Sequence, residues 1–281
     1  MKLPLVTHPP LQVPVVATDD RPFVTYNEHA QCPLVLVCDH ASNSLPLGYG
    51  RLGVDPKRFE EHIAFDIGAA CVTERLSHAL QTPAILCAFS RLLIDPNRQF
   101  HDPTLIPEVS DNVEIPGNRN LSAEERQHRV LQYHDAYHRG VDRLMRSLAD
   151  RDIVPAYIGI HSFTPSMQGV ARPWEVAILW NRDDRLATYM VDWLRHHTSF
   201  AVGENEPYAG HVAGYSMDRH GGGPGYPHVV IEIRQDLIGD QHGVAEWSDT
   251  LGRMLTEMLL DMAPFTPMTE DNPPESKRAW D

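Results

Sequence analysis

Residues 33–40 read PLVLVCDH, an apolar and partly β-branched run that ends in the polar pair Asp39-His40. A run of this kind is typical of a strand that is buried on both faces and presents polar groups at its carboxyl end. The same pattern returns at 153–162, where the apolar run ends in His161-Ser162. Further apolar runs predict strands at 84–89, 92–95, 176–180 and 229–233.

Between these strands, apolar residues recur at helical spacing. The pattern predicts helices at 56–80, 122–148, 184–196 and 244–262. Ser122 and Glu125 form a capping box at the start of the second helix. Strands that alternate with helices predict the α/β class, as a three-layer αβα fold with a mostly parallel mixed sheet. Ligands of such folds bind beyond the carboxyl ends of the strands.

A length of 281 residues favours one large domain, which we place at 33–263. The segment before it, 1–32, is rich in proline and is expected to be an extended arm. The charged tail at 264–281 is expected to be disordered. Residues 99–120 show no periodicity and predict a long loop, which we interpret as a lid.

The chain holds 24 Lys and Arg against 38 Asp and Glu, a formal charge of −14, which argues against nucleic acid as a partner. No apolar run is long enough to span a bilayer, and no export signal is recognised, so no membrane partner is expected. The four cysteines form no C-x-x-C pair, which favours reduced thiols and a cytoplasmic location. The sequence does not indicate an oligomeric state.

Two histidines at different strand ends, His40 and His161, together with an acidic group suit a catalytic divalent metal, with zinc as the first choice. Either ring can instead stabilise a turn through a hydrogen bond. For the third ligand, His62 and Asp66 lie four residues apart on the predicted helix, and Asp66 is preferred. Asn43, three residues after His40, is the alternative, and for it and Asp66 a cap or turn role is the competing interpretation.

Glu232 interrupts the apolar strand at 229–233 and is the candidate general base. Burial there disfavours the charged form and raises the pKa of the carboxyl group toward neutrality. Arg234 lies on the same side of the strand by the two-residue repeat, so a buried ion pair between the two side chains is the alternative.

Residues 90–98 read SRLLIDPNR, which we interpret as a short strand that delivers Asn97 and Arg98 to the sheet edge. A guanidinium binds a carboxylate through two parallel hydrogen bonds. The pair is therefore a candidate site for a carboxylate, and a structural ion pair between Asp95 and an arginine is the alternative.

Five motifs together resemble the N-formylglutamate amidohydrolases over most of residues 33–262. They are VLVCDHASNSLP (35–46), HIAFDIGA (62–69), SRLLIDPNR (90–98), IGIHS (158–162) and VVIEIRQDLI (229–238). The resemblance implies a fold similar to zinc carboxypeptidases and aspartoacylase. In those relatives a Glu stands three residues after the first histidine, and this sequence has Asn43 at that place.

The resemblance implies a metal-dependent amidohydrolase in which a metal-activated water attacks the N-formyl or N-acyl amide of a small anionic substrate such as N-formylglutamate. Glu232 then shuttles the proton, and Asn97 and Arg98 engage the substrate. Arg91 or Arg234 is expected to hold the other carboxylate.

Two alternatives remain open from the sequence. One is an amidohydrolase of the same mechanism that acts on another N-acyl amino acid or small peptide. The other is a non-catalytic small-molecule binding protein on the same scaffold.

Overall fold

The computed structural model describes residues 21–208, 210, 214–261 and 265–268 of the chain. Within these residues the main sheet has seven strands in the order β1-β3-β2-β6-β11-β9-β10. They run over Phe23–Tyr26 (β1), Leu34–Cys38 (β2), Ala84–Cys87 (β3), Ala156–Phe163 (β6), Val176–Leu179 (β9), Val202–Glu204 (β10) and His228–Arg234 (β11).

The central strands β3, β2, β6 and β11 are parallel to one another, whereas the pairings β1–β3 and β11–β9 are antiparallel. The carboxyl ends of the central strands therefore meet at one edge of the sheet. Every residue of β2, β3 and β6 is buried, which explains why these strands appear in the sequence as continuous apolar runs. The sheet confirms the predicted class, α/β with a mostly parallel mixed sheet.

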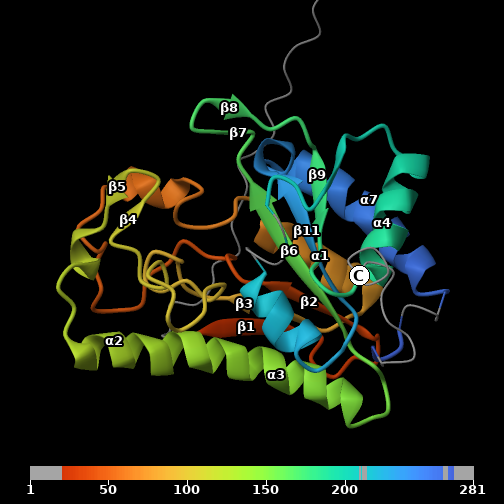
Figure 1. Cartoon of the computed structure of the whole chain (residues 1–281), viewed down its shortest axis with the longest axis horizontal. Helices are drawn as coiled ribbons and strands as arrows, with labels where there is room; N and C mark the ends of the chain where they lie inside the picture. Colours follow the sequence, from red (N-terminus) through yellow and green to blue (C-terminus); the bar gives the residue numbers. More distant parts are fainter. Residues whose placement is uncertain (1–20, 209, 211–213, 262–264, 269–281) are drawn as a thin grey trace, which may run out of the picture.

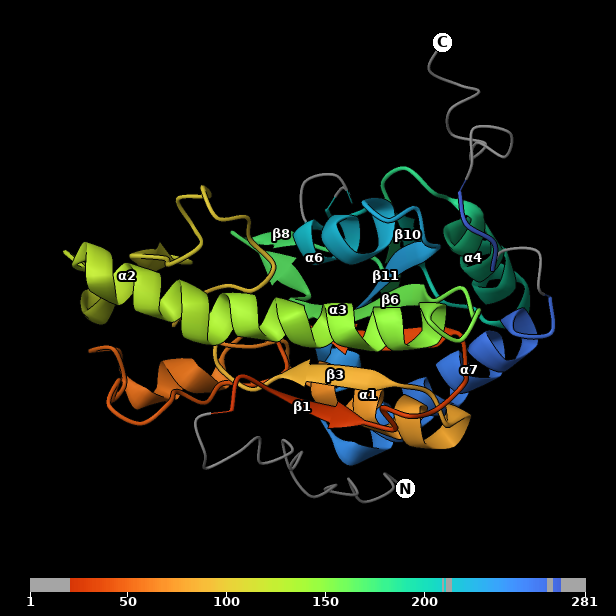
Figure 2. The same ribbon diagram turned by 90° about the horizontal axis from the view of Figure 1, so that it is seen from below.

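Helices cover both faces of the sheet (Figure 1, Figure 2). One face carries α1 (Ala69–Leu80), α4 (Arg185–His197) and α7 (Gln241–Met258), and the other carries the long α3 (Asp135–Ala149). Successive side chains of β2 enter different cores: Leu34 and Leu36 pack on the α1 side, Val35 and Val37 on the α3 side. The three-layer αβα arrangement follows from this alternation.

Shorter elements connect these layers. The hairpins are β4–β5 (Val109–Ser110, Val113–Glu114) and β7–β8 (Ser166–Met167, Val170–Ala171). The 3-10 helices are η1 (Pro56–Glu60), η2 (Pro116–Asn118) and η5 (Gln235–Leu237), and the π-helices are η3 (Val130–His134) and η4 (Asp218–Gly222). The short α-helices are α2 (Ala123–Arg129), where Ser122 Oγ accepts from Glu125 N–H at 3.1 Å as the capping box predicts, and α6 (Tyr215–Met217).

The helix predicted over 56–80 is wrong in its first part, because η1 is followed by irregular backbone until α1 begins at Ala69. Gly68 has a φ of +81°, and a Cβ there would lie 2.2 Å from Ile238 O, so only glycine fits. Asp66 N–H donates to His40 O at 2.9 Å. The segment is thus fixed across the strand ends, and it does not present a helix face.

The strand predicted over 92–95 is also wrong. Residues 88–98 form turns, and Leu93 N–H donates to Ser90 O at 2.9 Å. The leucines are buried for another reason: Leu93 packs into the core on the α3 side, and Leu92 packs into a separate small cluster. A buried loop between two cores therefore produces the same apolar pattern as a strand.

β1 lies in the segment predicted as an extended arm, and it pairs with β3 at the edge of the sheet. Residues 1–20 of that arm and most of the predicted tail at 264–281 lie outside the described residues. Among the helices that the structure describes, none combines the length and the apolar character needed to cross a bilayer.

Candidate active site

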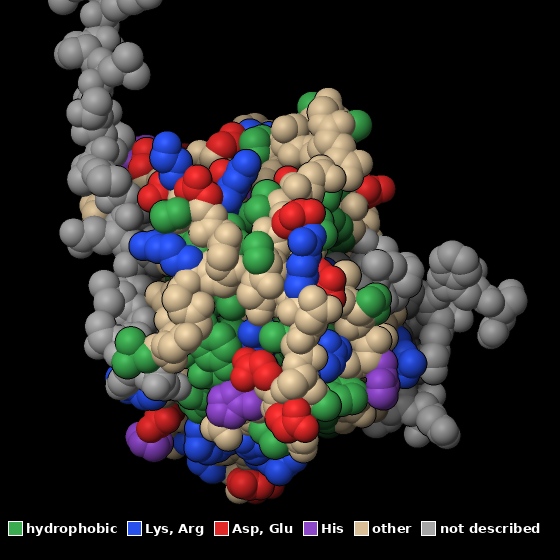
Figure 3. Space-filling model, turned by 90° about the vertical axis from the view of Figure 1, so that its left-hand side faces the viewer, with side chains coloured by type: hydrophobic (Ala, Val, Ile, Leu, Met, Phe, Trp, Pro, Cys, Tyr) green, Lys and Arg blue, Asp and Glu red, His purple; other side chains and the backbone are tan. Residues whose placement is uncertain are grey.

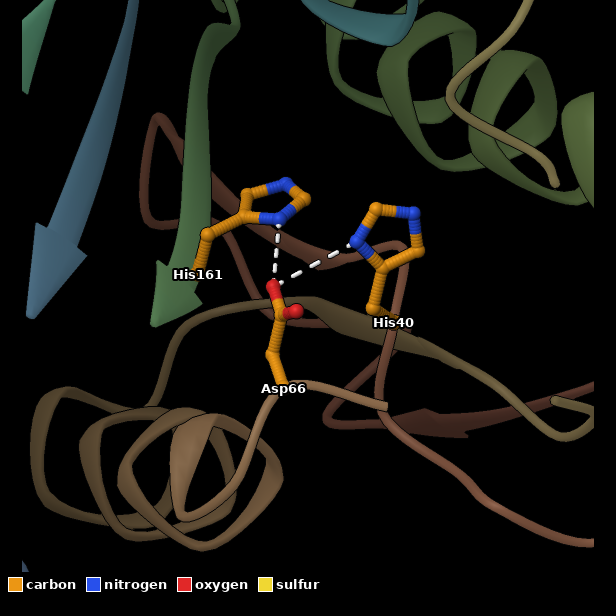
Figure 4. A group of neighbouring side chains, drawn as sticks. All are labelled: His40, Asp66 and His161. Carbon is orange, nitrogen blue, oxygen red and sulfur yellow. Dashed lines mark hydrogen bonds and ion pairs between the residues drawn. The ribbon is translucent and has the colours of Figure 1, made fainter. Parts of the chain in front are cut away.

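Three buried side chains, His40, Asp66 and His161, meet at the carboxyl edge of the sheet (Figure 4). His40 follows β2, His161 lies on β6, and Asp66 belongs to the irregular segment before α1. His161 Nδ1 lies 2.8 Å from Asp66 Oδ2, and His40 Nδ1 lies 3.3 Å from the same oxygen. One ligand atom from each residue falls within 4.8 Å of the other two. These three side chains can therefore hold one metal ion.

The other ring nitrogen of each histidine faces a second carboxylate. His40 Nε2 lies 2.8 Å from Asp95 Oδ1, and His161 Nε2 lies 3.4 Å from Asp39 Oδ2. Asp39 is held in place because Tyr137 OH donates to its other oxygen at 2.7 Å. Metal-binding histidines commonly donate their second ring N–H to a carboxylate, which fixes the tautomer and the ring orientation.

The number of protons that the two rings need shows whether the site suits a metal ion. A carboxylate accepts hydrogen bonds and donates none, so a ring that faces carboxylates through both nitrogens needs a proton on each. If His40, His161 and Asp66 held a divalent cation, this need would disappear. The rings could then be neutral, with Nε2–H of His40 donating to Asp95 and Nε2–H of His161 directed toward Asp39. The donor set therefore fits a divalent metal.

The carboxyl group at the centre of the site is ionised. Burial acts to raise the pKa of Asp66, but the electrostatic interaction with His40 and the hydrogen bond with His161 outweigh it and hold this pKa well below its usual range. Conversely, burial acts to lower the pKa of His161, and the hydrogen bonds with Asp39 and Asp66 raise it well above its ordinary value. The ionised form of Asp66 is the one that binds cations.

The group of possible metal ligands among the described residues contains Asp66 and neither of the two alternatives, Asn43 and His62. The Asn43 amide donates to Phe59 O at 2.8 Å and so stabilises the turn at η1. His62 is closer to the site, with Nδ1 3.6 Å from Asp66 Oδ1. Burial lowers the pKa of His62 to about 4, so its ring is neutral at neutral pH.

Glu232 lies directly beside His161 in the register of the parallel pair β6–β11. Its side chain is buried, and Oε2 has no hydrogen-bond partner among the described residues. Burial raises the pKa of Glu232 to about 7, which suits a group that takes up and returns a proton near neutral pH. The alternative is a buried ion pair between Glu232 and Arg234. In the structure Arg234 pairs with Asp236, with Arg234 Nε 2.8 Å from Asp236 Oδ1.

A cavity of about 710 Å³ lies over these residues, and both hairpins contribute to its wall. Ser110 of β4 and Met167 of β7 line it, so part of the loop predicted at 99–120 does border the site. Figure 3 shows the end of the described structure that carries α2 and the β4–β5 hairpin, where acidic and basic side chains are interspersed.

The predicted carboxylate-binding residues Arg91, Asn97 and Arg98 line the cavity. The charge of Arg91 is balanced, since Nη1 lies 3.5 Å from Asp66 Oδ1 and Nη2 lies 3.1 Å from Asp95 Oδ2. Arg98 instead contacts neutral groups: Nη1 donates to Asn97 O at 2.9 Å, and Nε donates to a threonine hydroxyl. Arg234 is not among the residues of the cavity wall.

Sequence reasoning missed four residues of this region. Arg172, which is 8% exposed, donates to Tyr208 OH at 2.8 Å and to Thr164 Oγ1 at 3.1 Å, and both acceptors line the cavity. No periodic pattern marks Arg172 or Tyr208, which lie outside the helices and strands. Asp39 and Asp95 were assigned no role toward the metal. The signal that identifies Asp39 is its position next to a histidine at the end of a strand.

One family model and several solved structures match this chain. Residues 32–239 match the N-formylglutamate amidohydrolase family. The crystal structure of gene product Atu2144 from Agrobacterium tumefaciens is 31% identical, with 85% of this chain and 95% of that one covered and a TM-score of 0.82. N-formylglutamate amidohydrolase from Ralstonia eutropha JMP134 has the same fold at 20% identity, with 85% and 97% covered and a TM-score of 0.65. No curated protein sequence matches significantly. Because the family match spans more than half of the sequence, the chain belongs to the N-formylglutamate amidohydrolase family.

Proposed function

We propose that this protein is a metal-dependent amidohydrolase that cleaves the N-formyl or N-acyl amide of an acidic amino acid such as N-formylglutamate. The observation that carries the proposal is the convergence of two Nδ1 atoms and a carboxylate oxygen on one point, beside a buried acid with a pKa of about 7. Membership of the family supports the reaction class.

His40, Asp66 and His161 are the residues that hold the metal in this proposal. Two imidazoles and one carboxylate are a donor set that zinc takes in catalytic sites, where one further position stays open. When bound there, a divalent cation polarises a carbonyl and lowers the pKa of water. Asp95 faces Nε2 of His40 and Asp39 faces Nε2 of His161, and these contacts keep the two rings oriented.

Glu232 is the proposed general base. Its carboxylate accepts the proton of the water that attacks the amide carbon, and the resulting acid returns that proton to the leaving amine. Both transfers need a group that changes protonation state near neutral pH, and burial gives Glu232 that property. The register of β6 and β11 keeps it beside the metal site.

Arg98 is the proposed partner of a substrate carboxylate or of the oxyanion, with Asn97 beside it. Its hydrogen bonds are with neutral groups and its charge acts on Asp95 without an ion pair among the described residues, whereas Arg91 forms ion pairs with two carboxylates. A second carboxylate fits against Tyr208. Arg172 occupies the acceptor side of that hydroxyl, which leaves the phenol proton to donate into the cavity.

The four cysteines are free thiols in the structure, which favours a reducing compartment such as the cytoplasm as the place of action.

The direct test measures formate release from N-formylglutamate by zinc-loaded and chelator-treated protein. We expect hydrolysis that depends on the added metal. N-acetylglutamate and N-formylglutamine are tested beside it to define the acyl and side-chain preferences. Strong preference for another acyl group would replace the named substrate. Saturable binding of these compounds without hydrolysis by the metal-loaded protein would show a binding protein in place of an enzyme.

A further inference from the structure

A second group of histidines lies behind the substrate-binding segment, away from the metal site. His134 Nε2 lies 2.9 Å from Arg98 O, and His138 Nε2 lies 2.9 Å from Pro96 O. These two carbonyls flank Asn97 on both sides. Because a carbonyl only accepts hydrogen bonds, both Nε2 atoms carry protons and donate.

The second nitrogen of His138 begins a hydrogen-bonded chain that leads away from this segment. His138 Nδ1 lies 2.8 Å from His220 Nε2, and His220 Nδ1 lies 2.8 Å from Asp142 Oδ1. The two rings stack with centroids 5.0 Å apart. The chain thus joins the Pro96 carbonyl to Asp142, whose side chain is 34% exposed.

The protons of this chain can be counted. Its two ends are oxygen acceptors, so each end needs an N–H, and the contact between the rings needs a third. Two neutral imidazoles carry only two ring protons, so one of the rings is an imidazolium.

The environment decides which ring carries the charge. Burial and the neighbouring histidines hold the pKa of His138 well below its ordinary value. Burial acts to raise the pKa of Asp142, but the hydrogen bond from His220 outweighs it and lowers this pKa. Of the two rings, His220 is the one that contacts the Asp142 carboxylate, so the geometry places the third proton on His220.

The backbone that presents these histidines is unusual. His134 ends the π-helix η3, and His220 lies in the π-helix η4. π-Helices account for well under about 1% of residues and frequently occur at functional sites. In η4, Gly221 approaches β11 so closely that a Cβ would lie 2.3 Å from His228 Cβ. Two rare segments thus direct one histidine each toward the same cluster.

The segment is held from the other side as well. Ser216 N–H donates to Asn97 Oδ1 at 3.0 Å, and Ser216 Oγ lies 3.4 Å from Pro96 O. Ser216 lies in the short helix α6, which is followed directly by η4, so two consecutive helical elements hold the Asn97 side chain and carry His220.

We infer that His134, His138, His220 and Asp142 are positioning residues that fix the segment 96–98 for substrate binding, with His220 as the doubly protonated ring of the hydrogen-bonded chain. The part of this inference that concerns substrate binding rests on the proposed function, whereas the protonation pattern of the histidines is independent of it.

The first test is histidine ring ¹⁵N NMR on the intact protein at neutral pH, with signals assigned through His220→Gln and His138→Phe variants. We expect both nitrogens of His220 to carry protons and His138 to carry one only on Nε2. Asp142→Asn should leave His220 with a single ring proton, and Asp142→Glu should restore the second. A singly protonated His220 in the unmodified protein would overturn the inference.

The second test is steady-state hydrolysis of N-formylglutamate. His138→Phe removes a donor to the segment, so KM should rise about tenfold while kcat changes less than about twofold. The control is His128→Gln. His128 is exposed on α2, so this substitution should leave KM and kcat unchanged. An unchanged KM in a folded His138→Phe protein contradicts the positioning role. Absence of hydrolysis in the unmodified protein contradicts the proposed function instead. The NMR result still tests the proton arrangement of the hydrogen-bonded histidines.

Discussion

Replacing Glu232 with Gln separates the cost of a buried charge from its use in catalysis. Burial raises the pKa of Glu232 from 4.5 to about 7 in the folded protein. Above about pH 7 the ionised side chain therefore destabilises the folded state by about 3 kcal/mol relative to a neutral one. Below the unfolded pKa of about 4.5 the side chain is neutral in both states and this effect is absent.

Glu232→Gln should therefore be more stable than the unmodified protein by about 3 kcal/mol at about pH 8.5, and the gain should disappear as pH falls to about 4. Urea unfolding of chelator-treated protein at the two pH values measures this difference, since a bound cation changes the field at Glu232. The same variant, loaded with zinc, should lose about a hundredfold to ten-thousandfold in kcat.

Two results would refute this reasoning. A stability difference that is the same at both pH values would show that the Glu232 carboxyl group is not held neutral by burial. Hydrolysis by Glu232→Gln within about tenfold of the unmodified enzyme would show that another group accepts the proton.

Three further substitutions test neighbouring parts of the site. Asp95→Asn weakens the hold on the His40 ring and should lower zinc affinity about 10- to 100-fold, measured by competition with a chelating dye; unchanged affinity would exclude this role. Arg98→Gln should raise KM for N-formylglutamate about 10- to 100-fold, while Arg234→Gln, outside the cavity wall, should leave it within about twofold. Asn43→Ala should lower the free energy of unfolding by about 1 kcal/mol without changing the bound zinc per chain, and a loss of zinc would reinstate Asn43 as a ligand.

The central sheet could be predicted because burial on both faces leaves a continuous apolar run in each strand. The same reasoning placed His40 and His161 at one edge, since parallel strands bring their carboxyl ends together. This reasoning did not predict the orientation of β9, which runs antiparallel to β11. The four residues of β9 carry no signal that distinguishes the two orientations. Strand β10 is only three residues long and gave no detectable pattern.

Asp66 lies where the sequence suggested, although the argument from helical spacing was wrong. The irregular backbone around it depends on Gly68 and its close approach to Ile238, a contact between segments far apart in the sequence. Arg172 and Tyr208 were missed for the same reason, because only the folded chain brings them together. Local patterns identify strand ends, whereas long-range contacts between loops decide the rest of the cavity.

The most direct test of the account is the metal content and metal environment of the purified protein. We expect one divalent ion per chain, with X-ray absorption showing zinc bound by two imidazole nitrogens at about 2.0–2.1 Å and by carboxylate oxygen. His161→Ala and Asp66→Ala should each abolish this signal. If no divalent ion co-purifies or binds on addition, or if both variants retain it, then His40, Asp66 and His161 do not form the metal centre.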